Sequence, residues 1–202
     1  QQGHCAIERD HLLAQTSQLL KIAAATLEIQ LQVQVKQQMF IEEIIADQTL
    51  YYAPKTYHVE KALAHHLTRI QRGTPPWQDT LKTAQIITTL TLSDSQHQAL
   101  TQALTKKLCI ITGGPGVGKT TLVKEIIHAL RTCKINIALC APTGRAAKRL
   151  QESTGLEAKT IHRLLKFEPH HFQFKHNAYH CLPVDLVIVD ETSMIDLHLM
   201  HA

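Results

Sequence analysis

The sequence predicts an α/β protein with a parallel sheet in its second half, preceded by a small, mainly helical module. Beyond residue 108, apolar strand-like runs alternate with helical patterns, which is typical of an open parallel sheet. A glycine-rich segment with helical spacing after it lies in this half. The first half instead places two amphipathic helices before a β-rich hairpin.

The helical module is predicted from leucine spacing and from a short polar turn. Residues 10–25 carry leucines at helical spacing, and a second amphipathic pattern runs over residues 27–35. Residues 39–45 and 49–52 are β-rich, and the short polar link between them suits a hairpin. Helices followed by a hairpin indicate a winged-helix-like module.

A second set of helical signals leads out of this module. A proline suits the first turn of a helix over residues 54–70, and residues 72–76 then interrupt the pattern. A further helix is expected from Trp77 to about Thr89, and Ser93 and Gln96 have the spacing of a capping box. The predicted division is an N-terminal winged-helix-like domain over 1–73, a linker helix over 74–91 and a lobe with the parallel sheet over 92–202.

The lobe assignment depends on a nine-residue motif. Residues 113–121 read Gly-Gly-Pro-Gly-Val-Gly-Lys-Thr-Thr and fill every fixed position of G-x-x-x-x-G-K-[ST]. Residues 109–112 in front suggest a short buried strand, and residues 122–127 behind have helical spacing. Backbone amides freed by the glycines and the following helix N-terminus both favour a phosphate anion. The motif therefore predicts an ATP site.

Within this motif, residue types suggest separate roles. Lys119 is expected to reach the β and γ phosphates, and the hydroxyl of Thr120 is expected to bind Mg²⁺. The nucleotide-binding candidates in the motif are Gly114, Pro115, Gly116, Val117, Gly118, Lys119, Thr120 and Thr121. A surface turn closed by a lysine is the structural alternative.

A second part of the site is predicted where an apolar run over residues 185–189 ends in Asp190 and Glu191. This pair follows the motif lysine by roughly 70 residues, a separation typical of folds with this motif. Asp190 is expected to support Mg²⁺ opposite Thr120, and Glu191 to polarise the attacking water. Apolar runs over residues 135–141 and 185–189, with a helix over 144–153 between them, complete the predicted sheet.

Composition sets limits on the function classes. The net charge is +4, with eight Lys/Arg against eight Asp/Glu in residues 1–92 and thirteen against nine beyond, so anionic ligands are favoured in the second half. Five widely spaced cysteines indicate no disulfide framework. No apolar run is long enough to span a bilayer, and the N-terminus lacks the basic and apolar regions of a signal peptide, so we expect a cytoplasmic protein and no membrane partner.

Four segments, in this order, resemble the RecD-type helicases of superfamily 1, which include the alpha chain of exodeoxyribonuclease V and longer, partner-independent relatives. The segments are residues 113–121, 141–150, 160–165 and 185–194. The resemblance implies a RecA-like lobe that uses ATP and Mg²⁺ to move 5′ to 3′ on single-stranded DNA and to unwind it in recombination and repair. It also implies other recombination or repair proteins as partners.

The same resemblance assigns further site residues. Gln96 stands where these helicases carry a glutamine that recognises adenine, although a capping box is a sufficient structural reason for a glutamine there. The positions that match the family's DNA-contacting motifs are Thr143, Gly144, Arg145, Thr160, His162 and Arg163. For His162, packing in a partly buried position is the alternative to DNA contact.

Two other function classes stay open at this point. One is a nucleotide-hydrolysing switch that does not act on nucleic acid, and the other is a docking module without activity of its own. A zinc site is not expected, because no compact ligand pairs occur among His170, His171, His176, His180 and Cys181, which suit a histidine-decorated hairpin. Tyr51, Tyr52 and Tyr57 are expected in the core of the winged-helix-like module.

The ends of the chain suggest an internal segment of a longer protein. The chain opens with Gln1 and stops soon after the acidic pair. Helicases of this superfamily close the ATP site with an arginine from a second lobe, which speeds hydrolysis by roughly 10³ to 10⁵ in other nucleotide hydrolases. We therefore expect this chain alone to bind ATP while hydrolysing it very slowly.

Overall fold

The computed structural model describes residues 4–83, 88–114 and 116–202. It separates into two compact units. The first runs to His66 and includes Asp196–His201, and the second consists of Leu67–Ile195 with Ala202. Each unit has its own hydrophobic core.

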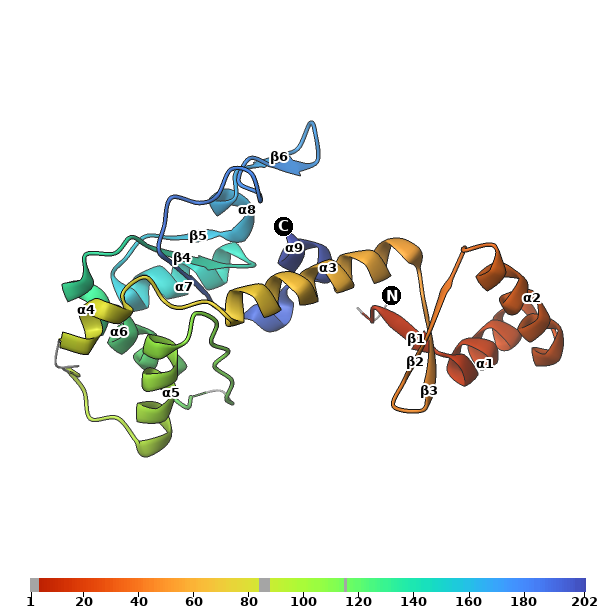
Figure 1. The fold of residues 1–202 in the computed structure, drawn as a ribbon, viewed down its shortest axis with the longest axis horizontal. Coiled ribbons are helices and arrows are strands. Elements are labelled where there is room, and N and C mark those ends of the chain that lie inside the picture. Colours follow the sequence, from red (N-terminus) through yellow and green to blue (C-terminus); the bar gives the residue numbers. More distant parts are fainter. Residues whose placement is uncertain (1–3, 84–87, 115) are drawn as a thin grey trace. The chain divides into compact units, whose positions relative to one another are not determined.

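The first unit is a three-stranded antiparallel sheet with a pair of helices, which lie together beside the strands in Figure 1. Its strand order is β1-β3-β2, and Tyr52 of β3 pairs with both Ala6 and Ile41. The predicted helix pair and hairpin are confirmed, whereas the first strand was not predicted. The elements are β1 (Ala6–Glu8), α1 (Arg9–Leu20), α2 (Ala24–Lys36), β2 (Ile41–Ile45) and β3 (Gln48–Tyr52).

Tyr51 and Tyr52 lie in the core of this unit, as predicted, whereas Tyr57 is only half-buried. Tyr51 is 2 % exposed and packs with Leu13 and Leu31. Its hydroxyl donates a hydrogen bond to Glu42 and accepts one from the amide of Gln32 at 3.3 Å. Burial, together with the bond to Glu42, raises the pKa of Tyr51 to about 12, because both favour the neutral phenol.

The second unit holds a parallel sheet with strand order β5-β4-β8. Two helices pack on it through Ile127 and Leu150, which share a core cluster with Leu139 of β4 (Figure 1). The α/β class and the parallel sheet are confirmed. The elements from residue 54 to the end of the chain include α3, which spans the boundary at His66, and α9, which belongs to the first unit. They are α3 (Pro54–Gln71), α4 (Gln78–Thr83), α5 (Asp94–Thr105), α6 (Lys119–Leu130), η1 (Arg131–Cys133), β4 (Ile137–Ala141), α7 (Gly144–Thr154), β5 (Ala158–Thr160), α8 (Ile161–Leu164), β6 (Phe167–Glu168), β7 (Gln173–Phe174), β8 (Leu186–Val189), η2 (Thr192–Met194) and α9 (Leu197–His201).

Two predicted elements differ from the structure. The strand expected over residues 109–112 is wrong: this segment forms no strand with the described residues, and Ile110 is 81 % exposed. Only Ile111 packs against the core, so the apolar run is used for one contact and not for a ladder. The helix expected to reach about Thr89 is described over Gln78–Thr83; residues 84–87 lie outside the described part, and Thr88 and Thr89 are not helical.

Searched over the described residues, the chain has no helix of sufficient length and apolar character to cross a membrane.

Candidate nucleotide and nucleic-acid site

The glycine-rich loop, residues 113–118, joins the extended segment to the N-terminus of α6. Two of its glycines have positive φ angles, 77° at Gly116 and 85° at Gly118. At Gly118 the positive φ disfavours a side chain, and a Cβ there would lie 2.6 Å from Nε2 of Gln96, so that Gln96 would have to move. Pro115, one of the predicted nucleotide contacts, lies outside the described residues.

Lys119 begins α6 and folds its side chain back along this loop. Its ammonium donates hydrogen bonds to the carbonyls of Gly113 and Gly114, both at 2.7 Å. Among the described residues no side chain caps the N-terminus of α6, so the first-turn amides, including those of Thr120 and Thr121, have no capping acceptor there. An uncapped helix N-terminus beside an ammonium group fits a phosphate anion well.

Gln96 lies against the same loop. Its Nε2 donates to the carbonyl of Val117 at 3.2 Å, and its Oε1 accepts from the backbone N–H of Ser93 at 3.0 Å. The predicted capping box is confirmed, because the Ser93 hydroxyl also accepts from the N–H of Gln96. One side chain therefore joins the N-terminus of α5 to the loop.

The acidic pair follows β8 directly. The N–H of Asp190 donates to the carbonyl of Cys140 at 2.9 Å, which continues the pairing of β8 with β4. The Oδ1 of Asp190 accepts from the N–H of Glu191 at 2.8 Å, and Glu191 has a positive φ of 52°. The chain thus turns sharply after Asp190, whose carboxylate is fixed at the strand end.

Strand pairing explains why these segments gather at one place. In the parallel ladders, Ala141 is opposite Thr160 and Cys140 is opposite Val189, so β4, β5 and β8 end at the same edge of the sheet. Helix α6 packs on this sheet and its C-terminus leads through η1 into the start of β4, so its N-terminus lies toward that carboxyl edge. The loop, Asp190 and the predicted DNA contacts after β4 and β5 all belong to this edge.

Two of the predicted DNA contacts act as helix caps. The hydroxyl of Thr143 accepts from the N–H of Ala146 at 3.2 Å, and that of Thr160 accepts from the N–H of Arg163 at 3.3 Å. Gly144 and Arg145 follow in the first turn of α7, where both are exposed. These caps occupy the N–H groups of Ala146 and Arg163, and the other N–H groups of the two first turns, with the cationic side chains of Arg145 and Arg163, are the expected contacts for an anionic backbone.

His162 packs against the hairpin that follows it. Its ring centroid lies 5.4 Å from that of Phe167 and 5.7 Å from that of Phe174. The two phenylalanines are themselves 5.0 Å apart, across the β6–β7 hairpin. This packing is a structural reason for a histidine at position 162, and its contact with DNA stays a prediction.

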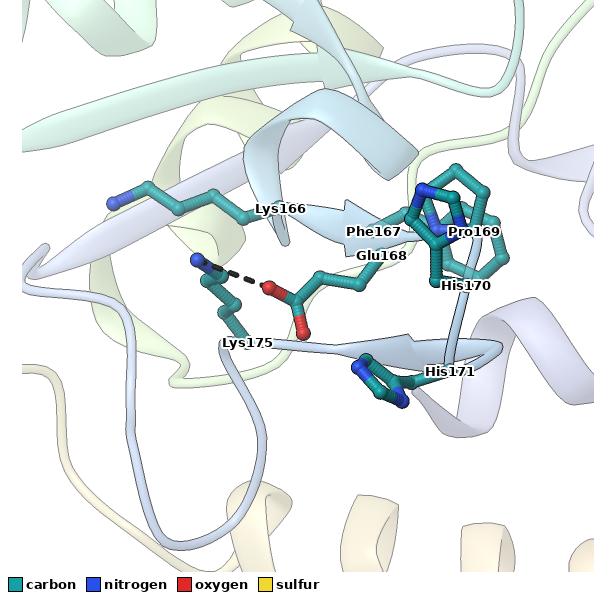
Figure 2. Close-up of a pocket in the computed structure, with 7 residues that line it drawn as sticks. All are labelled: Lys166, Phe167, Glu168, Pro169, His170, His171 and Lys175. Carbon is teal, nitrogen blue, oxygen red and sulfur yellow. Dashed lines mark ion pairs between the residues drawn. The ribbon is translucent and has the colours of Figure 1, made fainter.

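The histidine-decorated hairpin predicted from the sequence is present as β6 and β7, beside a cavity of about 410 Å³. Figure 2 shows the side chains of Lys175 and Glu168 facing each other, with a distance of 3.0 Å between Nζ and Oε1. The rings of His170 and His171 lie apart in the same view. Within the described residues, no three His, Cys, Asp or Glu side chains are grouped so as to hold a metal ion.

Sequence reasoning missed one pair of residues, which joins α6 to the segment before α5. Glu125 of α6 is 1 % exposed, and both of its carboxyl oxygens accept hydrogen bonds from Thr89. Glu125 stands at helical spacing among Leu122, Ile126 and Ala129, which are all buried. A charged residue on this otherwise apolar helix face is the sequence signal that could have indicated its burial.

Comparison with known proteins agrees with this geometry. A family model described as an AAA domain matches residues 96–202. The chain is 40 % identical over 157 residues to the ATP-dependent RecD2 DNA helicase of Deinococcus radiodurans, covering 74 % of this chain and 21 % of that protein. It is 40 % identical over 131 residues to the RecBCD enzyme subunit RecD of Mycolicibacterium smegmatis, covering 53 % and 24 %, and 37 % identical over 132 residues to that of Haemophilus influenzae, covering 54 % and 21 %.

The chain therefore spans about a fifth of the length of these curated relatives. Their similarity reaches beyond the family model, since the match to the Deinococcus protein extends over roughly three quarters of the chain. The chain belongs to the AAA domain family, and its resemblance to the RecD-type helicases is confirmed.

Proposed function

We propose that this chain supplies the ATP-binding lobe of an ATP-dependent DNA helicase that acts in recombination and repair. The observation that carries the proposal is the gathering of the glycine-rich loop, the acidic pair and two capped helix starts at one carboxyl edge. In open α/β sheets, ligands bind at this edge. Similarity to the RecD proteins favours a helicase over a nucleotide-dependent switch.

On this proposal the loop and the start of α6 bind ATP. Lys119 exchanges the loop carbonyls, which its ammonium now contacts at 2.7 Å, for oxygens of the β and γ phosphates. The backbone N–H groups of Gly114 and of residues 116–121 enclose the same phosphates, and Gln96 recognises adenine from the side of α5.

The acidic pair serves the metal ion and the attacking water. Thr120 and Asp190 are the residues that would hold Mg²⁺, and a hard oxygen donor set of this kind suits that ion. When bound, Mg²⁺ offsets the negative charge of the phosphates. Glu191, which follows Asp190 at the turn, accepts a proton from the attacking water.

DNA lies along the helix starts in this proposal. Thr143, Gly144 and Arg145 on α7 and Thr160, His162 and Arg163 at α8 are the proposed contacts, through backbone amides and cationic side chains. The proposed substrate is single-stranded DNA, moved 5′ to 3′, with other recombination or repair proteins as partners in the cytoplasm. The proposed domain division is a winged-helix-like domain over 1–73, a linker over 74–91 and the lobe over 92–202.

Binding of labelled single-stranded DNA at several salt concentrations tests this function. Arg145→Ala should weaken binding about tenfold and lower the slope of log affinity against log salt by about one. Lys148→Ala is the matched control on the same helix, because Lys148 is exposed and its charge is partly offset by Glu152 at 3.8 Å. Binding that depends neither on salt nor on Arg145 would contradict a DNA motor and favour a switch that does not act on nucleic acid.

A further inference from the structure

Glu125 is the buried charged side chain of the described residues. Its Oε2 accepts from the backbone N–H of Thr89 at 2.8 Å, and its Oε1 accepts from the hydroxyl of the same residue. A buried carboxyl group is costly unless donors satisfy it. Because one residue supplies both donors, the bonds fix Thr89 in position and in orientation against α6.

The segment that begins at Thr89 is held again at its other end. Gln96 closes the capping box with Ser93 and donates to the carbonyl of Val117 in the glycine-rich loop. Glu125 lies less than two helical turns after the first residue of α6. Residues 89–96 are thus attached at both ends to the same element, the loop followed by α6.

This attachment is separate from the packing that joins α5 to α6. That packing is apolar and includes Leu100, Leu104 and Leu122, which are all at most 3 % exposed. Thr89 is exposed and takes no part in this cluster. The Glu125–Thr89 bonds therefore act outside this apolar packing, on the residues that lead into α5, of which Leu92 also packs in the cluster.

We propose that Glu125 and Thr89 are positioning residues that hold residues 89–96 against the glycine-rich loop. By fixing the backbone that carries Gln96, they set how well this side chain distinguishes adenine from other bases, since a contact discriminates between ligands only if it is held in place before binding. The base discrimination rests on the proposed function; the positioning does not.

Positioning can be tested without nucleotide, by amide hydrogen exchange in the purified protein. Glu125→Leu removes both acceptors and keeps an apolar side chain of similar size in the buried position. Thr89→Val removes one donor, and Thr89→Ser, which keeps both, is the matched control. We expect the amides of Ser93, Gln96 and Gly118 to exchange about tenfold faster in Glu125→Leu, less so in Thr89→Val, and unchanged in Thr89→Ser. Unchanged exchange in both Glu125→Leu and Thr89→Val would overturn the proposal.

Base discrimination is measured as the ratio of dissociation constants for nonhydrolysable GTP and ATP analogues with magnesium. When Gln96 is present, Glu125→Leu should lower this ratio about tenfold. In a protein that already carries Gln96→Ala, Glu125→Leu should leave the ratio unchanged, because Glu125 affects base discrimination by positioning Gln96. An equal loss in both backgrounds would show that the pair acts by general stability. If the wild-type protein binds no ATP analogue, the proposed function fails, whereas the exchange experiment still decides the positioning.

Discussion

The two units of this chain each contain a three-stranded sheet with helices beside it, yet only one of them gathers a site. In the first unit the strands are antiparallel, so successive strands end at opposite edges. In the second unit the strands are parallel, and everything that follows a strand emerges at one edge. Strand direction therefore decides where polar residues can meet.

Polar side chains are used differently in the two units as a result. In the first, Tyr51, Glu42 and Gln32 bond to one another and close the core. In the second, Thr143 and Thr160 cap helix starts at the strand edge, while the start of α6 has no capping side chain. The first arrangement satisfies its own donors and acceptors, and the second leaves amides for a ligand.

Core truncation is the strongest way to separate the units. Leu130→Ala, at a position with 0 % exposure beneath the parallel sheet, should lower the free energy of unfolding by about 3 kcal/mol and weaken binding of the ATP analogue. Leu31→Ala in the first unit should also cost stability, while leaving analogue affinity within twofold. Thermal unfolding and calorimetry measure the two quantities. Loss of analogue binding in a folded Leu31→Ala protein would show that the site does not belong to the second unit alone.

Alkaline pH should act on the first unit. Because the pKa of Tyr51 is about 12 in the folded protein and near 10 in the unfolded chain, the folded state keeps its proton longer. This stability is full below pH 10 and is lost as the pH rises from 10 toward 12, on the order of 1–2 kcal/mol. Tyrosine absorbance and circular dichroism follow the transition. Tyr51→Phe should remove this part of the pH dependence, and an unchanged pH profile in that variant would contradict the assignment.

Helix caps give a smaller test of the same contrast. Thr143→Ala should lower the free energy of unfolding by about 1 kcal/mol. Thr143→Ser should lower it much less, since the serine hydroxyl can still accept from the N–H of Ala146. In the first unit, α2 begins after Ala23 without a side-chain cap, so Ala23→Ser should instead stabilise by roughly 0.5 kcal/mol. Chemical denaturation measures both changes. If Thr143→Ala left the free energy of unfolding unchanged, or if Ala23→Ser did not raise it, the proposed difference between the two helix starts would be contradicted.

The sequence predicts those features that depend on neighbouring residues, and it misses those that depend on pairing between residues far apart in the chain. Residues 113–121 and the acidic pair carry their own local patterns, and the structure places both segments at the carboxyl edge. The three-residue strand β1 has no such pattern, because it forms only by pairing with Tyr52 far along the chain. Residues 109–112 have the composition of a strand, but composition cannot supply a pairing partner.

The Glu125–Thr89 pair shows the same limit inside a helix. A glutamate in a helical pattern is usually solvated, so its burial depends on which segment packs over it. That segment starts at Thr89, in a region where helical spacing predicted a continuing helix. Thr89 donates two hydrogen bonds to Glu125, a residue far along the chain, and no spacing rule includes such a partner.

The central claim is that the loop, the start of α6 and Asp190 form a magnesium-dependent nucleotide site. Calorimetric titration with a nonhydrolysable ATP analogue tests it, with and without Mg²⁺, in the wild-type protein, in Lys119→Ala and in Lys124→Ala, an exposed lysine on the same helix. We predict uptake only with Mg²⁺, a loss of about 100-fold in Lys119→Ala and no change in Lys124→Ala, provided circular dichroism shows both variants folded. Binding that is absent in the wild type, independent of Mg²⁺, or equal in both lysine variants would contradict the account.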